Sequence, residues 1–347
     1  MTLRVLVTGA NGQDGAYLCK SLLEKGYEVH ACLRRGSTPK TGRLKLLQIV
    51  DKITIHQVDV TDYVSVIKLF TTVKPNRVYN LAAQSFVQDS FENPAVTSRI
   101  NFDAVTNMLE AIRIFGIDTK FYQASTSEMF GHVLSDPQNE NTPFNPMSPY
   151  AVSKCAAHYL VKNYRVAYGM EGVSGILFNH ESELRGREVV TRKITSGLAR
   201  IANGDTMPIK LGNCDSKRDW GYAPDYVDAM QAIIEGGKNT DYIVATNTVS
   251  SVRDFFILSA TFAGFKPEIV GEGVNERCVD TLSGTTLYEV DEKFYRPSEV
   301  AYLRGDNKKI FEDIGWSPST SLSQICEKMV SFDMDLISGS FQFDYTV

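Results

Sequence analysis

No apolar run in this 347-residue chain approaches the roughly 20 residues that a membrane-spanning helix needs. The opening residues lead directly into an apolar strand and a glycine-rich turn, without the small-residue cleavage site of a secretory signal. The six cysteines include no C-x-x-C pair, and no histidine spacing suits zinc, so neither a disulfide framework nor a metal site is expected. We therefore expect a cytoplasmic protein with reduced thiols.

Excess positive charge is missing as well. The formal net charge of −5 at pH 7 gives no support for binding to nucleic acid. Internal repeats and low-complexity tracts are also lacking, which excludes solenoids and disordered arrays. Any anionic ligand would therefore have to be held by a local group of arginines and lysines, against the overall sign of the chain.

What is present in the first third of the chain is an alternation of short β-branched runs with helical patterns. Near-continuous apolar strands separated by helices are typical of a parallel sheet covered on both faces, with right-handed crossovers. The pattern predicts an α/β fold with a doubly wound parallel sheet, a Rossmann-type core. The expected strands are 3–8, 28–33, 53–58, 77–81 and 120–123, and the expected helices are 14–25, 64–72 and 104–115.

From about residue 180 this rhythm gives way to polar stretches, with an insertion-like segment at 271–295. These stretches predict a smaller, discontinuous α/β lobe that binds the substrate. We expect the nucleotide-binding core to span 1–178, with part of 212–260 returning to it. The lobe would span 179–211 and 261–335, and residues 336–347 would form a tail.

The sequence GANGQDG follows the first expected strand and opens a helix. Gly9 permits a tight turn, Gly12 lets the backbone approach a pyrophosphate, and Gly15 allows the helix to pack closely on the strand. The helix N-terminus then offers free N–H groups and a dipole that favours anions. The spacing is one residue longer than the G-x-G-x-x-G fingerprint, so a glycine turn without a ligand stays an alternative. Gln13 and Asp14 belong to the same expected cofactor site.

The end of the second expected strand carries Arg34 and Arg35, where an NAD site would carry an acidic residue. Two guanidiniums suit the 2′-phosphate of NADP, and a solvated basic loop is the alternative. Position in the sheet favours NADP. The other residues expected along the cofactor path follow the third and fourth strands: Asp59, Val60, Leu81, Ala83 and Ser85.

Tyr150 and Lys154 lie at i and i+4 of a helical pattern that runs to about residue 168, so both side chains share one helix face. A neighbouring ammonium lowers the pKa of a phenol, which makes Tyr150 a candidate general base that shares the cofactor site with Lys154. The Y-x-x-x-K spacing alone is common. Here it follows the fifth strand of the expected sheet, and that position gives it its value.

That fifth strand leads into ASTSEMFG, at the edge of the sheet where doubly wound folds place their active sites. A hydroxyl at Ser125 or Thr126 can bond a sugar hydroxyl or the oxygen of Tyr150. Glu128 is unusual, because carbonyl reduction needs no carboxylate there, whereas dehydration needs a base for a carbon-bound proton. The alternative is that Glu128 only stabilises the start of a helix.

Further motifs extend the pattern along the chain, and together they resemble the GDP-mannose 4,6-dehydratase family of the extended short-chain dehydrogenases/reductases. The resemblance runs in family order from residue 9 to residue 300. NHES followed by VTRKI and RDWG is its most specific part. The motifs that carry it are GANGQDG, YNLAAQSFV, FYQASTSEMFG, SPYAVSK, GILFNHES, VTRKI, LGN, KRDWG and FYRPSEV.

The resemblance implies a lyase that uses NADP without net consumption to convert GDP-mannose into its 4-keto-6-deoxy derivative. Tyr150 would take the O4 proton, Thr126 would polarise O4, and Glu128 would take the C5 proton as water leaves C6. Lys154 would hold the ribose and tune Tyr150. The donor of a proton to the leaving hydroxyl stays open, because Ser127 stands where some related dehydratases carry an acid.

The resemblance also assigns binding residues in the second half of the chain. His180 and Arg185 match positions on the nicotinamide side of the cofactor. The positions that match the nucleotide-sugar site are Ser85, Ser127, Asn179, Lys193, Arg218, Arg296 and Glu299. The loop 34–43 resembles the segment by which family members associate, which implies a homodimer or homotetramer.

The chain departs from the usual family pattern at Val96, Glu183, Val189, Tyr222 and Pro224, with Arg187 close to Glu183 in the sequence. Glu183 and Arg187 are expected beside the sugar, so a GDP-linked heptose is an alternative substrate. A nucleotide-sugar epimerase or 4-reductase is the rival of the same fold, and a non-catalytic NADP-binding protein is the rival of another class. Glu128 beside Thr126 and Ser127 speaks against the first rival, because ketone reduction needs only the tyrosine and the lysine. Retention of Tyr150, Lys154 and Glu128 speaks against the second.

Overall fold

The computed structural model describes the chain except residues 1, 38–39, 295–299, 301, 342 and 344–347. At its centre lies a seven-stranded parallel sheet of order β11-β6-β5-β4-β1-β2-β3, which confirms the expected Rossmann-type core. Because β1 pairs with β2 on one side and β4 on the other, the winding reverses beside β1 and opens a crevice there. The strands are β1 (Arg4–Thr8), β2 (Glu28–Leu33), β3 (Thr54–Gln57), β4 (Arg77–Asn80), β5 (Lys120–Thr126), β6 (Gly172–Leu177) and β11 (Tyr242–Val244).

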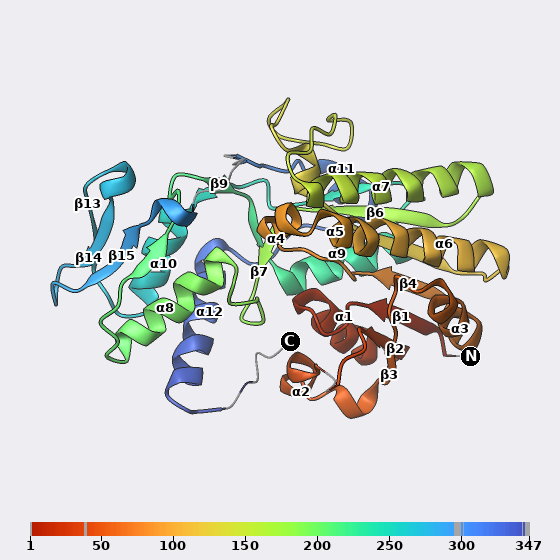
Figure 1. The fold of residues 1–347 in the computed structure, drawn as a ribbon, viewed down its shortest axis with the longest axis horizontal. Coiled ribbons are helices and arrows are strands. Elements are labelled where there is room, and N and C mark those ends of the chain that lie inside the picture. Colours follow the sequence, from red (N-terminus) through yellow and green to blue (C-terminus); the bar gives the residue numbers. More distant parts are fainter. Residues whose placement is uncertain (1, 38–39, 295–299, 301, 342, 344–347) are drawn as a thin grey trace.

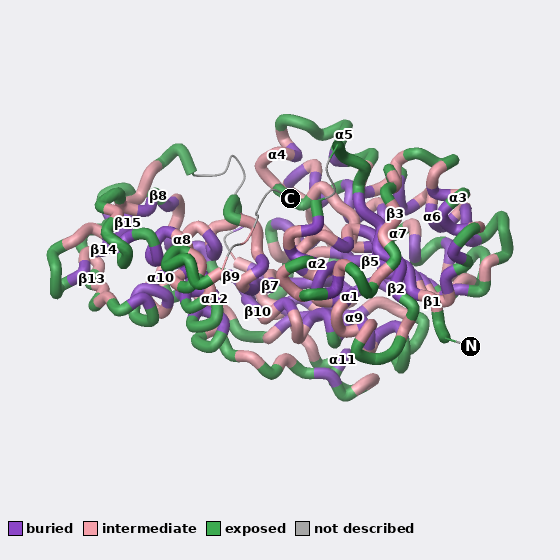
Figure 2. The backbone as a smooth tube through the Cα atoms, turned by 90° about the horizontal axis from the view of Figure 1, so that it is seen from below, coloured by how far each residue is buried: buried purple, intermediate pink, exposed green. Residues whose placement is uncertain are grey.

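Helices cover both faces of this sheet (Figure 1). In β1, Val5 and Val7 belong to one buried cluster and Leu6, between them, belongs to another. Successive side chains of a strand point to opposite faces, so a continuous apolar run is what a doubly covered strand requires. Figure 2 shows this buried backbone along β2 and β5. One cluster includes α1 (Gln13–Glu24) and α9 (Ala223–Gly236), and the other includes α3 (Tyr63–Val73), α6 (Ala104–Ile114) and α7 (Pro149–Tyr168).

The expected strands and helices of the first third are found within one residue of their predicted ends, with one exception. Strand β5 continues to Thr126, three residues beyond the expected end, because Ala124, Ser125 and Thr126 pair with the last three residues of β6. The hydroxyl-rich segment had been expected to follow the strand. Its pairing instead fixes the backbone of Thr126 in the sheet.

A smaller α/β lobe with its own core stands beside the sheet (Figure 1). It consists of a four-stranded sheet of order β13-β14-β15-β8 that packs with three helices. The insertion-like segment supplies two of these strands. The elements are α8 (Val190–Ala202), β8 (Ile209–Leu211), α10 (Val252–Phe262), β13 (Pro267–Val270), β14 (Arg277–Asp280), β15 (Thr286–Val290) and α12 (Leu322–Ile337).

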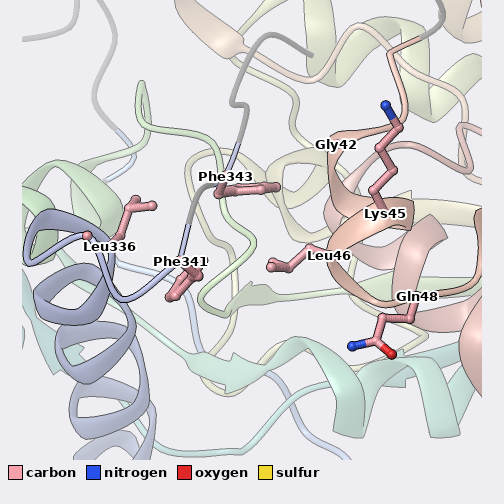
Figure 3. Close-up of a pocket in the computed structure, with 8 residues that line it drawn as sticks. Gly42, Lys45, Leu46, Gln48, Leu336, Phe341 and Phe343 are labelled. Carbon is pink, nitrogen blue, oxygen red and sulfur yellow. The ribbon is translucent and has the colours of Figure 1, made fainter.

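The packing differs from the expected domain limits at two places. Helix α11 (Lys308–Ile314) packs against α9 and β11, and Ile310 and Trp316 join the core of the large sheet rather than the lobe. The expected tail from 336 begins inside α12, and its Phe341 ring lies 4.9 Å from that of Phe332. Figure 3 shows a cavity that has Phe341 and Leu336 on one side and Leu46 on the other. We propose a division in which 308–316 belong to the nucleotide-binding core.

Two short ladders lie between the sheet and the lobe (Figure 1). Strand β7 (Asn179–Glu181) pairs in parallel with β10 (Trp220–Tyr222), and β9 (Lys217–Arg218) pairs antiparallel with β12 (Ser250–Ser251). The NHES and RDWG motifs are therefore hydrogen-bonded partners. None of the helices in the described parts of the chain combines the length and the apolar character that crossing a bilayer requires.

A buried ion pair fixes the helices of the lobe. Arg192 on α8 and Asp333 on α12 are 0% and 1% exposed, and their closest nitrogen–oxygen distance is 2.7 Å. Thr195 donates a second hydrogen bond to Asp333, also at 2.7 Å. Burial raises the pKa of Asp333, and the charge of Arg192 opposes that rise. The pair therefore depends on both partners being present.

We expect Asp333→Ala to destabilise the protein by about 3–5 kcal/mol, because it leaves the buried Arg192 guanidinium without its carboxylate. Urea denaturation of the purified variant measures this change. Asp335→Ala is the matched control, because this carboxylate is exposed two residues further along the same helix. It should change stability by less than about 0.5 kcal/mol. Equal stability of the two variants would contradict the prediction.

Candidate active site

A cleft of about 1010 Å³ runs along the carboxyl ends of the central strands and reaches the lobe. All of the expected catalytic and cofactor-binding residues line it: Gly9, Gly12, Gln13, Asp14, Gly15, Arg34, Arg35, Asp59, Val60, Leu81, Ala83, Ser85, Thr126, Glu128, Tyr150, Lys154, His180 and Arg185. The residues that the sequence singled out for the cofactor and the reaction therefore lie together in one cleft. The individual roles stay predictions.

The residues expected to bind the nucleotide sugar divide into three groups. Ser85, Ser127, Asn179 and Arg218 line the cleft. Lys193 lies beside it, with Nζ 3.5 Å from the ring centre of the lining residue Phe294. Burial lowers the pKa of Lys193, opposed by the charge of Asp291. Two expected residues, Arg296 and Glu299, lie outside the described part of the chain.

The glycine turn has the geometry of a phosphate cradle. Gly9 has φ +66°, and a Cβ there would lie 2.9 Å from the backbone of Leu81 and Ala82. A Cβ at Gly15 would lie 2.3 Å from the carbonyl oxygen of Gly9, so the helix packs on the turn as predicted. No side chain caps the N-terminus of α1 at Gly12. Its N–H groups suit an anion, and the residues present therefore fit a dinucleotide.

The cofactor end of the cleft is basic. Arg34 and Arg35 are exposed after β2, and Lys40 and Arg99, which the sequence analysis did not single out, also line the cleft. Basic residues outnumber acidic ones among the described lining residues, although the chain is acidic overall. This matches the expected local group of cations. Such a field attracts a polyanionic ligand.

A second loop is fixed by Asn101, which the sequence analysis also missed. Asn101 lies in a π-helical turn (Arg99–Asp103) and is 2% exposed. Its side chain accepts from the backbone N–H of Gln84, donates to the carbonyl of Gln84, and donates to Ser153 on α7. Pi-helical turns occur frequently at functional sites. Here the turn joins the loop after β4 to the helix that carries Tyr150.

Local sequence explains how the catalytic candidates are presented. Ser148 caps α7 by accepting from the N–H of Ala151 at 3.1 Å, and Pro149 occupies the first helical turn. Tyr150 therefore begins the helix with a fixed backbone. Across from it, Thr126 ends β5 and accepts from the N–H of Glu128 at 3.3 Å, which starts a short 3-10 helix (Ser127–Phe130).

The electrostatics of Tyr150 and Lys154 differ from expectation. Burial raises the pKa of Tyr150 to about 12, and the Thr126 hydroxyl, rather than an ammonium, is the largest influence in the opposite direction. Burial lowers the pKa of Lys154 to about 8. The expected lowering of the Tyr150 pKa by Lys154 is therefore wrong for the protein by itself. Lys154 donates at 2.6 Å to the carbonyl of Ala124, which directs its ammonium to the strand backbone.

The two hydroxyls that the sequence left as alternatives are distinguished by their partners. Ser125 contacts Nδ1 of the buried His158 at 3.1 Å, whereas the Thr126 hydroxyl interacts with Tyr150. Burial lowers the pKa of His158, although the charge of Asp241 opposes this. Of the two hydroxyls, Thr126 is thus the one that lies against the Tyr150 side chain.

Beside the turn, β7 presents its first two residues, Asn179 and His180, to the cleft. His180 contacts Asp14 at 2.8 Å. Arg185 lies 3.2 Å from the carboxylate of Glu181, a fully buried residue that also accepts from Thr191 at 2.6 Å. Side chains that can carry opposite charges therefore lie next to each other along this part of the cleft.

The RDWG motif separates its two charged residues. Arg218 lines the cleft, whereas Asp219 is 0% exposed and accepts from the N–H and hydroxyl of Thr246 and the N–H of Asn247. Burial raises the pKa of Asp219 to about 6, and these hydrogen bonds oppose the rise. Asp219 thus holds a loop. Of the two charged residues in the motif, only Arg218 lines the cleft.

The departures expected beside the sugar have another explanation. Glu183 is not among the described lining residues, and the Tyr222 hydroxyl donates to its carboxylate at 3.1 Å. The charge of Arg187 acts on Asp333 in the lobe. Two departures from the family pattern, Glu183 and Tyr222, therefore bind each other. Neither Glu183 nor Arg187, the two residues that suggested a heptose substrate, is among the described residues that line the cleft.

Comparison with known proteins relates the chain to one enzyme family. A family model described as "GDP-mannose 4,6 dehydratase" matches residues 6–329. The GDP-mannose 4,6-dehydratase of Sinorhizobium fredii is 43% identical over 344 residues, which cover 97% of this chain and 98% of the relative. That of Homo sapiens is 42% identical over 344 residues, covering 96% and 91%.

Solved structures of lower identity share the fold. A UDP-glucose 4-epimerase from Thermotoga maritima has a TM-score of 0.82 at 22% identity, over 96% of this chain and 100% of that chain. A dTDP-glucose 4,6-dehydratase from Bacillus anthracis has a TM-score of 0.79 at 16% identity, over 98% of each chain. The extent and identity of the sequence matches go further than fold: the chain belongs to the GDP-mannose 4,6-dehydratase family.

Proposed function

We propose that this protein is a hydro-lyase that converts GDP-mannose into GDP-4-keto-6-deoxymannose with NADP as its bound cofactor. The observation that carries the proposal is Glu128, which lies in the same cleft as Thr126, Tyr150 and Lys154, directly after β5. Reduction of a ketone needs only the hydroxyl, the phenol and the ammonium. Elimination of water also requires a base that removes a proton from carbon, and the added carboxylate supplies it.

A nicotinamide cofactor held along the cleft by the glycine turn and Lys154 would supply the acceptor for a hydride from C4 of the sugar and its donor to C6, with the proton taken up by Tyr150 passing to C5. Tyr150 takes the proton of the C4 hydroxyl, and the Thr126 hydroxyl binds the same oxygen. The resulting ketone acidifies the C5 proton, which Glu128 removes while the C6–oxygen bond breaks. From β5 through the adjoining 3-10 helix, Glu128 is the only acidic residue, so we assign it protonation of the leaving hydroxyl too.

The choice of NADP is supported by Arg34 and Arg35, both of which line the cleft at the end of β2. We expect the double variant Arg34→Ala/Arg35→Ala to bind NADP more weakly by on the order of ten- to a hundredfold, because each guanidinium forms charge-assisted hydrogen bonds. Calorimetric titration with NADP measures the loss. Titration with NAD, which has no 2′-phosphate, is the control and should change little. An equal loss for both cofactors would contradict the proposed role.

We also propose that the chain associates as a homodimer or homotetramer. Support comes from α7, where Val152, Tyr159 and Val166 are 54%, 53% and 79% exposed at seven-residue spacing. That spacing places the three side chains along one side of the helix. Sedimentation equilibrium of the purified protein measures the assembly.

A cytoplasmic location is consistent with the six cysteines, none of which forms a disulfide.

The experiment that tests the proposed activity is incubation of the purified protein with GDP-mannose and NADP, followed by mass spectrometry. We expect a product lighter by one water molecule, with no net accumulation of reduced cofactor. A product of unchanged mass but altered C4 configuration would indicate an epimerase. Net oxidation or reduction without loss of water would indicate a simple oxidoreductase. Either result would overturn the proposal.

A further inference from the structure

Each ring nitrogen of His180 lies against an oxygen atom. One oxygen belongs to a backbone carbonyl and the other to Asp14, and when Asp14 is ionised neither of them can donate a hydrogen bond. Nδ1 lies 2.7 Å from the carbonyl oxygen of Phe178, and Nε2 lies 2.8 Å from the carboxylate of Asp14. A carbonyl has no proton to give, so Nδ1 must carry one. A neutral imidazole would then turn a bare lone pair on Nε2 toward the carboxylate. The geometry therefore requires one more proton on the pair than a neutral imidazole and a carboxylate hold.

The position of that proton follows from the electrostatics. Burial alone would lower the pKa of His180, but the charge of Asp14 and the hydrogen bond to it outweigh burial and raise the pKa above 6.5. Burial alone would raise the pKa of Asp14, but His180 outweighs it and the pKa falls below 3.8. The extra proton therefore resides on His180, as an imidazolium facing a carboxylate.

Two pairs of opposite charge meet here, His180 with Asp14 and Arg185 with Glu181. Arg185 lies 3.2 Å from Glu181, and its charge also lowers the pKa values of Asp14 and His180. With all four groups charged, the cluster is neutral overall. The Tyr226 ring from α9 stacks on the imidazole at 4.5 Å, and Gln13 donates to Asp14 at 3.0 Å. The phenols that face Asp14, Tyr122 and Tyr150, have pKa values raised mainly by burial and stay neutral. Removal of the His180 proton would therefore leave Asp14 as a net negative charge.

Asp14 occupies a position where a net negative charge matters. It stands in the first turn of α1, directly after Gln13, and lines the cleft where the helix offers its N–H groups. A bare carboxylate there would repel the diphosphate of a dinucleotide. We propose that His180 is a positioning residue that neutralises Asp14 and so keeps the glycine turn able to bind an anion. This inference rests on the proposed use of a dinucleotide cofactor.

The proposal predicts a proton linkage. The protonated pair binds the diphosphate, so affinity is fully present below the pKa of His180 and is lost as pH rises through it. If bound diphosphate raises that pKa by about one unit, affinity changes by about tenfold across the transition. Lys154, whose pKa is about 8, also titrates in the same cleft. Its contribution is common to all variants at positions 14 and 180, so comparison among them isolates the pair.

The test is a double-mutant cycle with NADP as the probe and no sugar nucleotide present. His180→Gln should weaken NADP binding by about tenfold at about pH 7, because Asp14 becomes a bare carboxylate. In Asp14→Asn, NADP affinity should no longer fall as pH rises through the pKa of His180, because no carboxylate is left for His180 to neutralise. The double variant should recover the affinity of Asp14→Asn. If it stays as weak as His180→Gln, His180 acts by direct contact and the inference is overturned.

A second measurement needs no cofactor. A nitrogen-15 NMR pH titration of the five histidines should show that His180 keeps both ring protons to a higher pH in the wild type than in Asp14→Asn. The His180→Gln variant assigns the signal, and His56→Gln, half-buried on β3, is the control that leaves it in place. Loss of the His180 proton at the same pH in both proteins would overturn the inference. Failure to dehydrate GDP-mannose would leave the cycle and the spectrum unchanged, so the two proposals fail separately.

Discussion

Replacement of Glu128 by glutamine is expected to abolish dehydration while leaving cofactor binding near the wild-type level. The glutamine side chain has the same shape as the glutamate side chain. The hydrogen bond from the backbone N–H of residue 128 to the Thr126 hydroxyl is also kept. The amide cannot accept the C5 proton. Loss of a positioned general base costs about 10²–10⁴ in rate, and loss of both assigned proton transfers places the expected effect at the upper end, about 10⁴.

The variant should also stop at a defined point. Tyr150 and Thr126 remain in place, so the C4 hydroxyl can still be oxidised. The sugar then carries a ketone at C4 but retains its C6 hydroxyl. We expect reduced cofactor to accumulate to one equivalent per active site in a single-turnover experiment, which cofactor absorbance measures. Mass spectrometry of the same sample should show a nucleotide sugar that has lost two hydrogens and no water.

A matched control is available in Glu92→Gln. This carboxylate is exposed at the end of α4 (Val87–Glu92), a helix outside the β5 segment. It should dehydrate at the wild-type rate. Turnover of Glu128→Gln within about tenfold of wild type would exclude Glu128 as the base, because a general base contributes more than that.

The sequence predicts much of this fold because its signals are local. Strand β1 carries three consecutive buried apolar residues, Val5 to Val7, as a strand covered on both faces requires. Ser148-Pro149 marks the start of α7 within a residue. The extension of β5 to Thr126 depends on pairing with β6, more than 45 residues away, and no local pattern encodes it. For the same reason the sequence did not reveal that α11 packs against α9 and β11.

The site shows the same division between local and distant effects. The spacing of Tyr150 and Lys154 placed both in the cleft, but their pKa values follow from burial, which spacing does not reveal. Glu183 was expected at the sugar because of its position in a motif. Its partner Tyr222, 39 residues away, draws the carboxylate elsewhere. Pairings such as His180 with Asp14 required the three-dimensional structure.

Tyr150→Phe is expected to remove activity at the first step instead of the second. The phenylalanine retains the ring but has no oxygen to accept the C4 hydroxyl proton, so the sugar cannot be oxidised. We expect a loss of about 10³–10⁴ in the rate of cofactor reduction, with no ketone intermediate. Single-turnover cofactor absorbance therefore separates this variant from Glu128→Gln, which should complete that step.

The pH dependence of that first step carries the sharper prediction. The reactive form needs Tyr150 deprotonated and Lys154 protonated, although the pKa values are about 12 and about 8. Below about pH 8 the phenolate population rises tenfold per pH unit, so the rate rises with unit slope. Above that value Lys154 loses its proton as fast as Tyr150 gains reactivity, so the two changes cancel and the rate levels off. The break near pH 8 therefore reports Lys154 rather than the tyrosine.

The variant Lys154→Met tests this assignment. Its residual rate should keep rising above pH 8, because no ammonium is left to lose its proton. A break near pH 8 in this variant would show that a group other than Lys154 causes the break.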